Sequence, residues 1–220
     1  MQASGSMVSI CGLVLAALTH AATPLNDVER KPYIDAFVRK QQETQTYEAT
    51  LKQTLRLRGL KEPVESEGRV CYKAPGELLM SFSKPAGDYL IVTGADIYLK
   101  KANRPLVHRK SAAKQTRPDQ NAQLLLSLFQ GGAADWGAQF DIDMARDGDQ
   151  LIVTMRPKQP AAAARQVRIE NMIALPSNEI RSIQISFGED NSLTYEFSDA
   201  KRNRPIDDKL FVAPDSDRKL

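Results

Sequence analysis

The chain has 220 residues, of which 42% are hydrophobic and 26% are charged, with 12 Gly and 12 Pro. This length suits one domain with a sizeable core, and the apolar fraction excludes a disordered or fibrous protein. With 30 basic and 27 acidic residues the net charge is only +3, which argues against a nucleic-acid-binding protein. Two histidines and two cysteines argue against a zinc site and most histidine-dependent catalysis.

The N-terminal segment contains no Asp, Glu, Lys or Arg up to Asn26. A compact apolar run over residues 10–17, followed by small residues, predicts a secretory signal peptide over residues 1–22. The run is well short of the roughly 20 residues that span a bilayer. We therefore expect an exported protein whose single mature domain comprises residues 23–220. Its one remaining thiol, Cys71, cannot form an internal disulfide, so the fold must rest on its core.

Next in chain order come a helix and a long strand. Residues 28–42 carry apolar side chains at three- and four-residue spacing behind Asn26 and Asp27, which predicts a capped amphipathic helix. From Tyr47 the period changes to two, and apolar residues alternate with polar ones up to Arg58. That alternation predicts a strand with one apolar face and one solvated face.

Shorter alternating runs follow, and they predict further antiparallel strands and hairpins. These runs cover residues 70–72, 78–82, 89–93, 97–101, 140–144, 151–155, 167–175, 183–187 and 193–197. Between them, residues 119–130 predict a short and very apolar helix that Gly131 and Gly132 end. About ten strands and two helices without βαβ spacing predict a mainly β (α+β) fold. We expect one strongly curved antiparallel sheet with helices on its concave side.

Few residues are candidates for polar chemistry. His108 lies in a predicted strand, residues 106–110, and has no evident catalytic partner. Asp141, Asp143, Asp147 and Asp149 miss the calcium-loop pattern because Ala145 occupies a ligand position and no Glu closes the loop. Neither a phosphate-binding glycine loop nor a nucleophile elbow is present in the sequence. We expect no catalytic residue, no metal and no cofactor.

Residues 97–118 are rich in basic side chains and contain no acidic side chain. Such a segment is either a solvated edge or a docking patch for an acidic partner or an anionic membrane. The candidate patch residues are Lys100, Lys101, Arg104, Arg109 and Lys110.

The strongest signal is a surplus of one-sided strands. Their apolar face must pack against helices or enclose a ligand, and the pattern does not separate a filled core from a cavity. Strand parity places nine residues on inward faces: Leu51, Leu55, Leu57, Leu78, Met80, Phe82, Ile183, Ile185 and Phe187. Leu125 and Phe129 of the apolar helix would form a lid over them.

At residues 68–85, GRVCYKAPGELLMSFSKP, the chain resembles the LolA family of periplasmic lipoprotein carriers. Gly68, Pro75, Gly76 and Pro85 match the family's spacing. Weaker matches continue through residues 92–96, 124–129, 135–136 and 151–158, and then Asn203, 210–212 and Pro214. The resemblance extends over about residues 33–215.

The resemblance implies an incomplete antiparallel barrel whose open side is lidded by helices. A hydrophobic cavity would then hold the acyl chains of a lipoprotein or lipid, each buried CH₂ contributing about 0.8 kcal/mol. It also implies a monomeric, non-enzymatic periplasmic protein. Its partners would be an inner-membrane ABC transporter of the LolCDE type and an outer-membrane acceptor of the LolB type. The same fold also serves envelope sensors of lipids or lipoproteins, and carriers of other lipids such as glycolipids.

The chain departs from the resembled family at Ala74, where that family has an arginine that holds the lid closed through hydrogen bonds. Alanine has no donor, and Lys73 should point to the opposite face of the strand. We therefore expect a lid that opens more readily.

Overall fold

The computed structural model describes residues 22–94, 96–110, 117–131, 136–160 and 166–213. The predicted signal peptide, apart from Ala22, lies outside the described residues, as do Ala95, residues 161–165 and Pro214. No helix within these ranges is both long and apolar enough to cross a bilayer.

A single sheet of twelve antiparallel strands dominates the fold, in the order β1-β8-β9-β10-β11-β12-β2-β3-β4-β5-β6-β7. The strands are β1 (Thr23–Pro24), β2 (Thr46–Arg56), β3 (Val64–Lys73), β4 (Glu77–Lys84), β5 (Ala86–Thr93), β6 (Asp96–Lys100), β7 (Val107–Lys110), β8 (Phe140–Asp147), β9 (Gln150–Pro157), β10 (Val167–Ala174), β11 (Glu179–Phe187) and β12 (Ser192–Arg202). The sheet is not closed, and β1 and β7 form its two edges. This architecture confirms the predicted mainly β fold. The strand β1 was not predicted, because two residues carry no periodicity.

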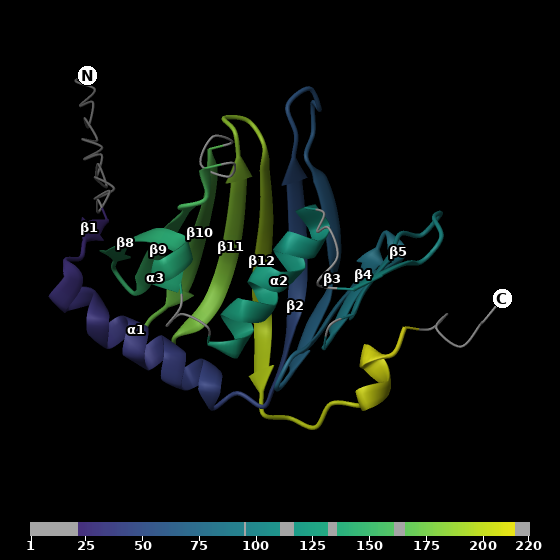
Figure 1. Cartoon of the computed structure of the whole chain (residues 1–220), viewed down its shortest axis with the longest axis horizontal. Helices are drawn as coiled ribbons and strands as arrows, with labels where there is room; N and C mark the ends of the chain where they lie inside the picture. The colour runs from purple at the N-terminus through teal and green to yellow at the C-terminus, as the bar shows by residue number, and fades with distance from the viewer. Residues whose placement is uncertain (1–21, 95, 111–116, 132–135, 161–165, 214–220) are drawn as a thin grey trace, which may run out of the picture.

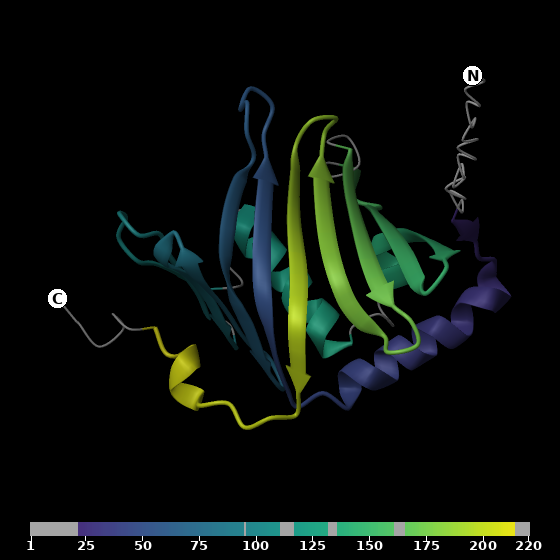
Figure 2. The ribbon, with the colours of Figure 1, turned by 180° about the vertical axis from the view of Figure 1, so that it is seen from behind.

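Three α-helices accompany the sheet: α1 (Asp27–Gln42), α2 (Arg117–Gln130) and α3 (Trp136–Gln139). Asn26 caps α1 as predicted, with its side chain accepting hydrogen bonds from the backbone N–H groups of Val28 and Glu29. Figure 1 shows α2 and α3 in front of the sheet and α1 along its lower border. In Figure 2, from behind, the strands lie in front of the helices. The helices therefore lie on one side of a curved sheet, as expected.

Two glycines permit close approaches that the fold requires. A Cβ on Gly68 would lie 2.0 Å from the backbone oxygen of Ser81, so only glycine fits where β3 and β4 shift register. Gly131 follows α2 with φ of 72°, and a Cβ there would lie 2.9 Å from Cβ of Gln41. The predicted end of the apolar helix is thus confirmed, and the same residue lets α2 reach α1.

The opposite, convex face carries a smaller core under the C-terminal segment. The 3₁₀ helix η2 (Asp208–Phe211) places Phe211 against Cys71, Leu79 and Ile91, which are all buried. Burial raises the pKa of the Cys71 thiol and keeps it uncharged. Cys71 is therefore a packing residue of the convex core.

Candidate functional site

The concave face of the sheet brings together most of the residues predicted to face inward. Seven of the eleven are buried: Leu51, Leu78, Met80, Leu125, Phe129, Ile183 and Ile185. Leu55, Phe82 and Phe187 are half-buried, and Leu57 is 37% exposed. All except Leu55 and Leu57 belong to, or pack against, one continuous hydrophobic core. In this structure the face is covered by α2.

Phe129 of α2 packs against three aromatic rings of the sheet. It is fully buried, and its ring centroid lies 4.9 Å from that of Tyr47, 5.8 Å from Tyr72 and 6.1 Å from Phe197. Those three rings come from β2, β3 and β12. One helical side chain thus joins strands that lie next to one another in the sheet but far apart in the sequence.

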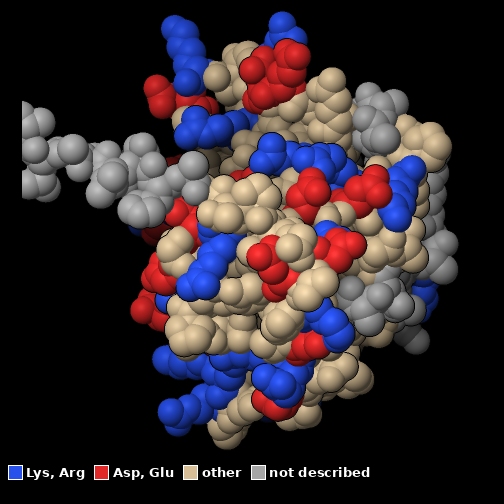
Figure 3. All heavy atoms as spheres, turned by 90° about the vertical axis from the view of Figure 1, so that its left-hand side faces the viewer, with Lys and Arg blue, Asp and Glu red and all other residues tan. Residues whose placement is uncertain are grey.

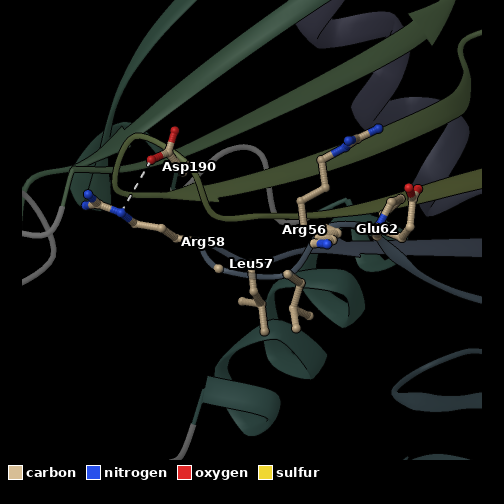
Figure 4. A pocket seen from close by; sticks show the side chains of 9 residues that line it. Arg56, Leu57, Arg58, Glu62 and Asp190 are labelled. Carbon is tan, nitrogen blue, oxygen red and sulfur yellow. Dashed lines mark ion pairs between the residues drawn. The ribbon is translucent and has the colours of Figure 1, made fainter.

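Beyond the part of the sheet under α2, the β2–β3 hairpin carries exposed apolar side chains. Leu57, Leu60 and Val64 are 37%, 51% and 49% exposed. A hollow of about 310 Å³ is lined by residues 56–63 and Asp190. Figure 4 shows Arg58 reaching toward Asp190, with which it forms an ion pair of 3.8 Å, and Leu57 pointing the other way, toward the ribbon of α2. Leu57 follows the last residue of β2, so strand parity no longer buries it.

At the other end of β2, a polar cluster fixes α1 to the sheet. Arg202 donates to the Glu179 carboxylate through Nε at 3.1 Å and Nη2 at 3.0 Å, and through Nη1 to Oγ1 of Thr44 at 2.6 Å. Nζ of Lys40 lies 2.9 Å from the same carboxylate. The Arg202 guanidinium also lies 4.9 Å from the Tyr47 ring centroid. The cluster therefore joins α1, β11, β12 and β2 at one corner.

Asn203 holds the same corner through its side chain. With φ of 53° it adopts the left-handed conformation, which Asn tolerates better than most residues. Its Oδ1 accepts from the backbone N–H of Gln45 at 2.8 Å, and its Nδ2 donates to the carbonyl of Glu43 at 3.1 Å. The turn from α1 into β2 is thereby tied to the end of β12. Asn203 is among the residues that carry the family resemblance, whereas no sequence pattern points to Arg202 or Glu179.

Ala74 and Lys73 lie on opposite faces of β3 and its continuation, as predicted. Ala74 packs against the concave core, whereas Lys73 forms ion pairs with Asp208 and Glu77. A contact between the lid and this turn comes from Gln130, whose Nε2 donates to the carbonyl of Pro75 at 2.5 Å. The end of α2 is thus tied to the residue after Ala74 by one neutral hydrogen bond.

The five candidate patch residues lie on β6, β7 and the segment between them. Lys101 forms an ion pair with the buried Asp88 at 2.7 Å, and Lys110 pairs with Asp96 at 2.8 Å. Arg104 is exposed, and Lys100 and Arg109 are half-buried. Part of the predicted patch is therefore engaged in ion pairs with neighbouring strands.

His108 and the four aspartates lie at the surface of strands and turns. Nε2 of His108 lies 2.6 Å from Oδ1 of Asp96, and its ring stacks on Tyr98 at 4.5 Å. Hydrogen bonds from Lys110 and then His108 hold the pKa of Asp96 below its usual value. Asp143 pairs with Arg156 and Asp141 with Lys158. Within the described ranges no three His, Cys, Asp or Glu side chains gather as a metal site would require.

Charges of both signs are interspersed on the side of the molecule that carries α1 and β8. Figure 3 shows acidic and basic side chains alternating over most of this face, with a group of basic side chains at its lower edge. The mixed charges therefore produce no extended electrostatic potential of one sign over this face.

An open, curved antiparallel sheet with helices packed on its apolar concave face is an incomplete β-barrel lidded by helices. The family model of the outer membrane lipoprotein carrier protein LolA matches residues 42–214, so the chain belongs to this family. No curated protein matches the sequence.

Solved structures with the same general arrangement are distant in sequence. A putative outer membrane lipoprotein-sorting protein domain from Vibrio parahaemolyticus is 9% identical, with a TM-score of 0.46, and the match covers 81% of this chain and 94% of that one. A DUF1329 family protein from Desulfovibrio piger is 13% identical, with a TM-score of 0.48 and coverage of 83% and 96%. LprF from Mycobacterium bovis is 13% identical, with a TM-score of 0.44 and coverage of 84% and 97%.

The Glu179 cluster leads to a prediction about acid stability. Burial alone would raise the pKa of Glu179, but hydrogen bonds from Arg202 and Lys40 outweigh it and lower the pKa. The carboxylate therefore stabilises the fold fully above the ordinary glutamate pKa of about 4.3, and this contribution is lost as the pH falls through the lowered value. We expect Glu179→Gln to reduce the free energy of unfolding by about 1–3 kcal/mol at pH 7.

Urea denaturation of both proteins between pH 3 and pH 8 measures this effect. The difference between wild type and Glu179→Gln should be constant down to about pH 5 and shrink below the glutamate pKa of about 4.3. Glu189→Gln, which removes an exposed carboxylate, is the matched control and should have little effect. A difference that is as large at pH 3 as at pH 7 would show that the charge of Glu179 is not what stabilises this corner.

Proposed function

We propose that this protein is a non-enzymatic periplasmic carrier that binds the acyl chains of a lipoprotein or lipid between the sheet and α2. Membership of the LolA family supports this function. The observation that carries the proposal is the nature of the concave face, where buried side chains of ten neighbouring strands and of α2 form one continuous and mainly apolar core. Such a layer binds hydrocarbon without any catalytic group.

In the proposed carrier, the acyl chains take the place of α2 against the concave face. Leu125 and Phe129 then act as the lid, and the buried residues Leu51, Leu78, Met80, Ile183 and Ile185 line the opened space with Phe82 and Phe187. Leu55 and Leu57 lie toward the β2–β3 hairpin, where the apolar surface continues into solvent. This end of the sheet is the proposed entrance for the cargo.

We further propose that the carrier meets an inner-membrane ABC transporter and an outer-membrane acceptor. Lys100, Lys101, Arg104, Arg109 and Lys110 are the basic residues proposed for docking, and Lys101 and Lys110 would exchange their present ion pairs for pairs with the partner. An acidic surface on either partner would be complementary to this segment.

The first test of carriage replaces Leu55 at the proposed entrance. Leu55→Glu places a carboxylate among apolar residues that the acyl chain must pass, and we expect it to reduce the lipid that co-purifies with the protein by tenfold or more. The measurement is mass spectrometry of lipids extracted from equal amounts of the two purified proteins. The matched control is Thr50→Glu, which adds the same charge on the exposed face of the same strand. Equal lipid in Leu55→Glu and wild type would refute this entrance, and absence of lipid from the wild type would count against the carrier itself.

A second test concerns the lid contact at position 74. We expect Ala74→Arg to add hydrogen-bond donors beside the lid, contributing about 1.5–3 kcal/mol to the closed state. Amide hydrogen exchange should then slow in residues 124–129 of α2. Lys73→Arg is the control, because Lys73 contacts Asp208 on the opposite face and a change there should not alter exchange of the lid. Unchanged exchange in Ala74→Arg would mean that position 74 does not act as a latch in this protein.

A further inference from the structure

One row of the concave face is polar. The strand register places Asn171 of β10 opposite Ile183, Ile183 opposite Tyr195, Tyr195 opposite Gln53, and Gln53 opposite Ser66. Four of these five side chains are polar, and we call Asn171, Tyr195, Gln53 and Ser66 the polar band. Its members lie on β10, β12, β2 and β3, and Ile183 of β11 separates Asn171 from Tyr195 in the row.

The rows on both sides of the polar band are apolar. Toward the β2–β3 hairpin the next row consists of Ile169, Ile185, Leu193, Leu55 and Val64. On the other side, toward α1, Phe197 pairs with Leu51, and Ile173 pairs with Ile180. The band therefore interrupts the apolar face at one depth, one row inside the proposed entrance.

The polar band has hydrogen-bonding groups that the protein leaves unused. Asn171 is 1% exposed, and its Oδ1 accepts no hydrogen bond from the described residues. Its Nδ2 donates to Sδ of Met155 at 3.4 Å, and a thioether is a weak acceptor. Across the described ranges, no hydrogen bond joins the side chain of Tyr195, Gln53 or Ser66 to another residue. Tyr195 is 4% exposed and Ser66 is 8% exposed.

Leaving the Asn171 amide oxygen buried and unpaired destabilises the protein, so this atom calls for a hydrogen-bond donor, and the other three residues place further polar groups in the same row. The band offers amide and hydroxyl groups, which donate and accept, and it contains no charged residue. Burial also raises the pKa of Tyr195, so its phenol stays neutral. A neutral carbonyl can accept hydrogen bonds from the Tyr195 hydroxyl and from Nδ2 of Asn171, and the unpaired Oδ1 of Asn171 can accept from an amide N–H or a hydroxyl of the same ligand.

We propose that the polar band binds the ester or amide linkage that joins the acyl chains of the cargo to its headgroup. This inference rests on the proposed carrier function and specifies the chemistry of its ligand. Between Gln53 and Tyr47 the strand continues for six residues, about 20 Å at 3.3–3.4 Å per residue, along the apolar face. The acyl chains would extend along this length while the linkage stays at the band and the headgroup lies toward the hairpin.

The test compares two lipids that differ only in the linkage. The purified protein is incubated with phosphatidylcholine vesicles that contain equal amounts of 1,2-dipalmitoylglycerol, a diester, and 1,2-di-O-hexadecylglycerol, its diether. The lipid bound to the re-isolated protein is then quantified by mass spectrometry. We expect the wild type to retain the diester about threefold to tenfold over the diether, as one or two neutral hydrogen bonds would give.

Asn171→Leu and Tyr195→Phe should each lower this ratio toward one while both lipids are still bound. Asn171→Leu should also leave the melting temperature unchanged or raise it, because it removes an unpaired buried amide. If the amide were needed for the fold, its removal would lower the melting temperature. Gln184→Leu makes the same chemical change on the exposed face of β11 and should leave the ratio at the wild-type value.

A wild-type ratio of one, with both lipids bound, would overturn the linkage site and leave the carrier function intact. A preference that persists in the Asn171→Leu/Tyr195→Phe double variant would also overturn it. Binding of neither lipid would instead refute the carrier function on which the proposal rests.

Discussion

Phe129 packs against the rings of Tyr47, Tyr72 and Phe197, and through this contact α2 covers the concave face of the sheet. A twelve-stranded sheet that is apolar on one face cannot remain exposed to water. The helix α2 buries this apolar face, although the two edge strands of the sheet do not pair with each other to close a barrel. The rest of the fold fixes where that helix lies: Gly131 lets it contact α1, and Gln130 ties its end to the turn after β3.

In the proposed carrier, an acyl chain competes with Phe129 of α2 for the concave face. Burying a phenylalanine side chain contributes about 1.5–3 kcal/mol, and each buried CH₂ of an acyl chain contributes about 0.8 kcal/mol. A chain that places about four methylenes on the concave face therefore offsets the release of one such side chain. The Glu179–Arg202 cluster and Asn203 hold α1 and the end of the sheet in place independently of α2. One helix can then move while the frame around it stays fixed.

The sequence was sufficient for the strands and for most of the concave face, because a period of two places alternate residues on one side whatever the tertiary structure. The end of α2 at Gly131 was predictable for a similar local reason. The Arg202–Glu179 pair was not, since it joins two strands across a hairpin and Glu179 also contacts Lys40 of a helix that is distant in the sequence. The polar band was missed because it exists only once the register of β10, β11, β12 and β2 is known. Leu57 shows the limit of parity, which no longer applies after a strand ends.

In the proposed carrier, α2 and an acyl chain occupy the same face of the sheet in turn. A tether between α2 and the β3–β4 turn tests it directly, because Gly76 and Gln130 are neighbours: a Cβ on Gly76 would lie 3.1 Å from Nε2 of Gln130. In the Gly76→Cys/Gln130→Cys variant a short bis-maleimide can join the two new thiols, while the buried Cys71 stays unreactive. The measurement is uptake of dipalmitoylglycerol from vesicles before and after cross-linking, with each single-cysteine variant treated in the same way. We expect only the cross-linked double variant to lose uptake; undiminished uptake with α2 tethered would contradict the exchange of α2 for an acyl chain.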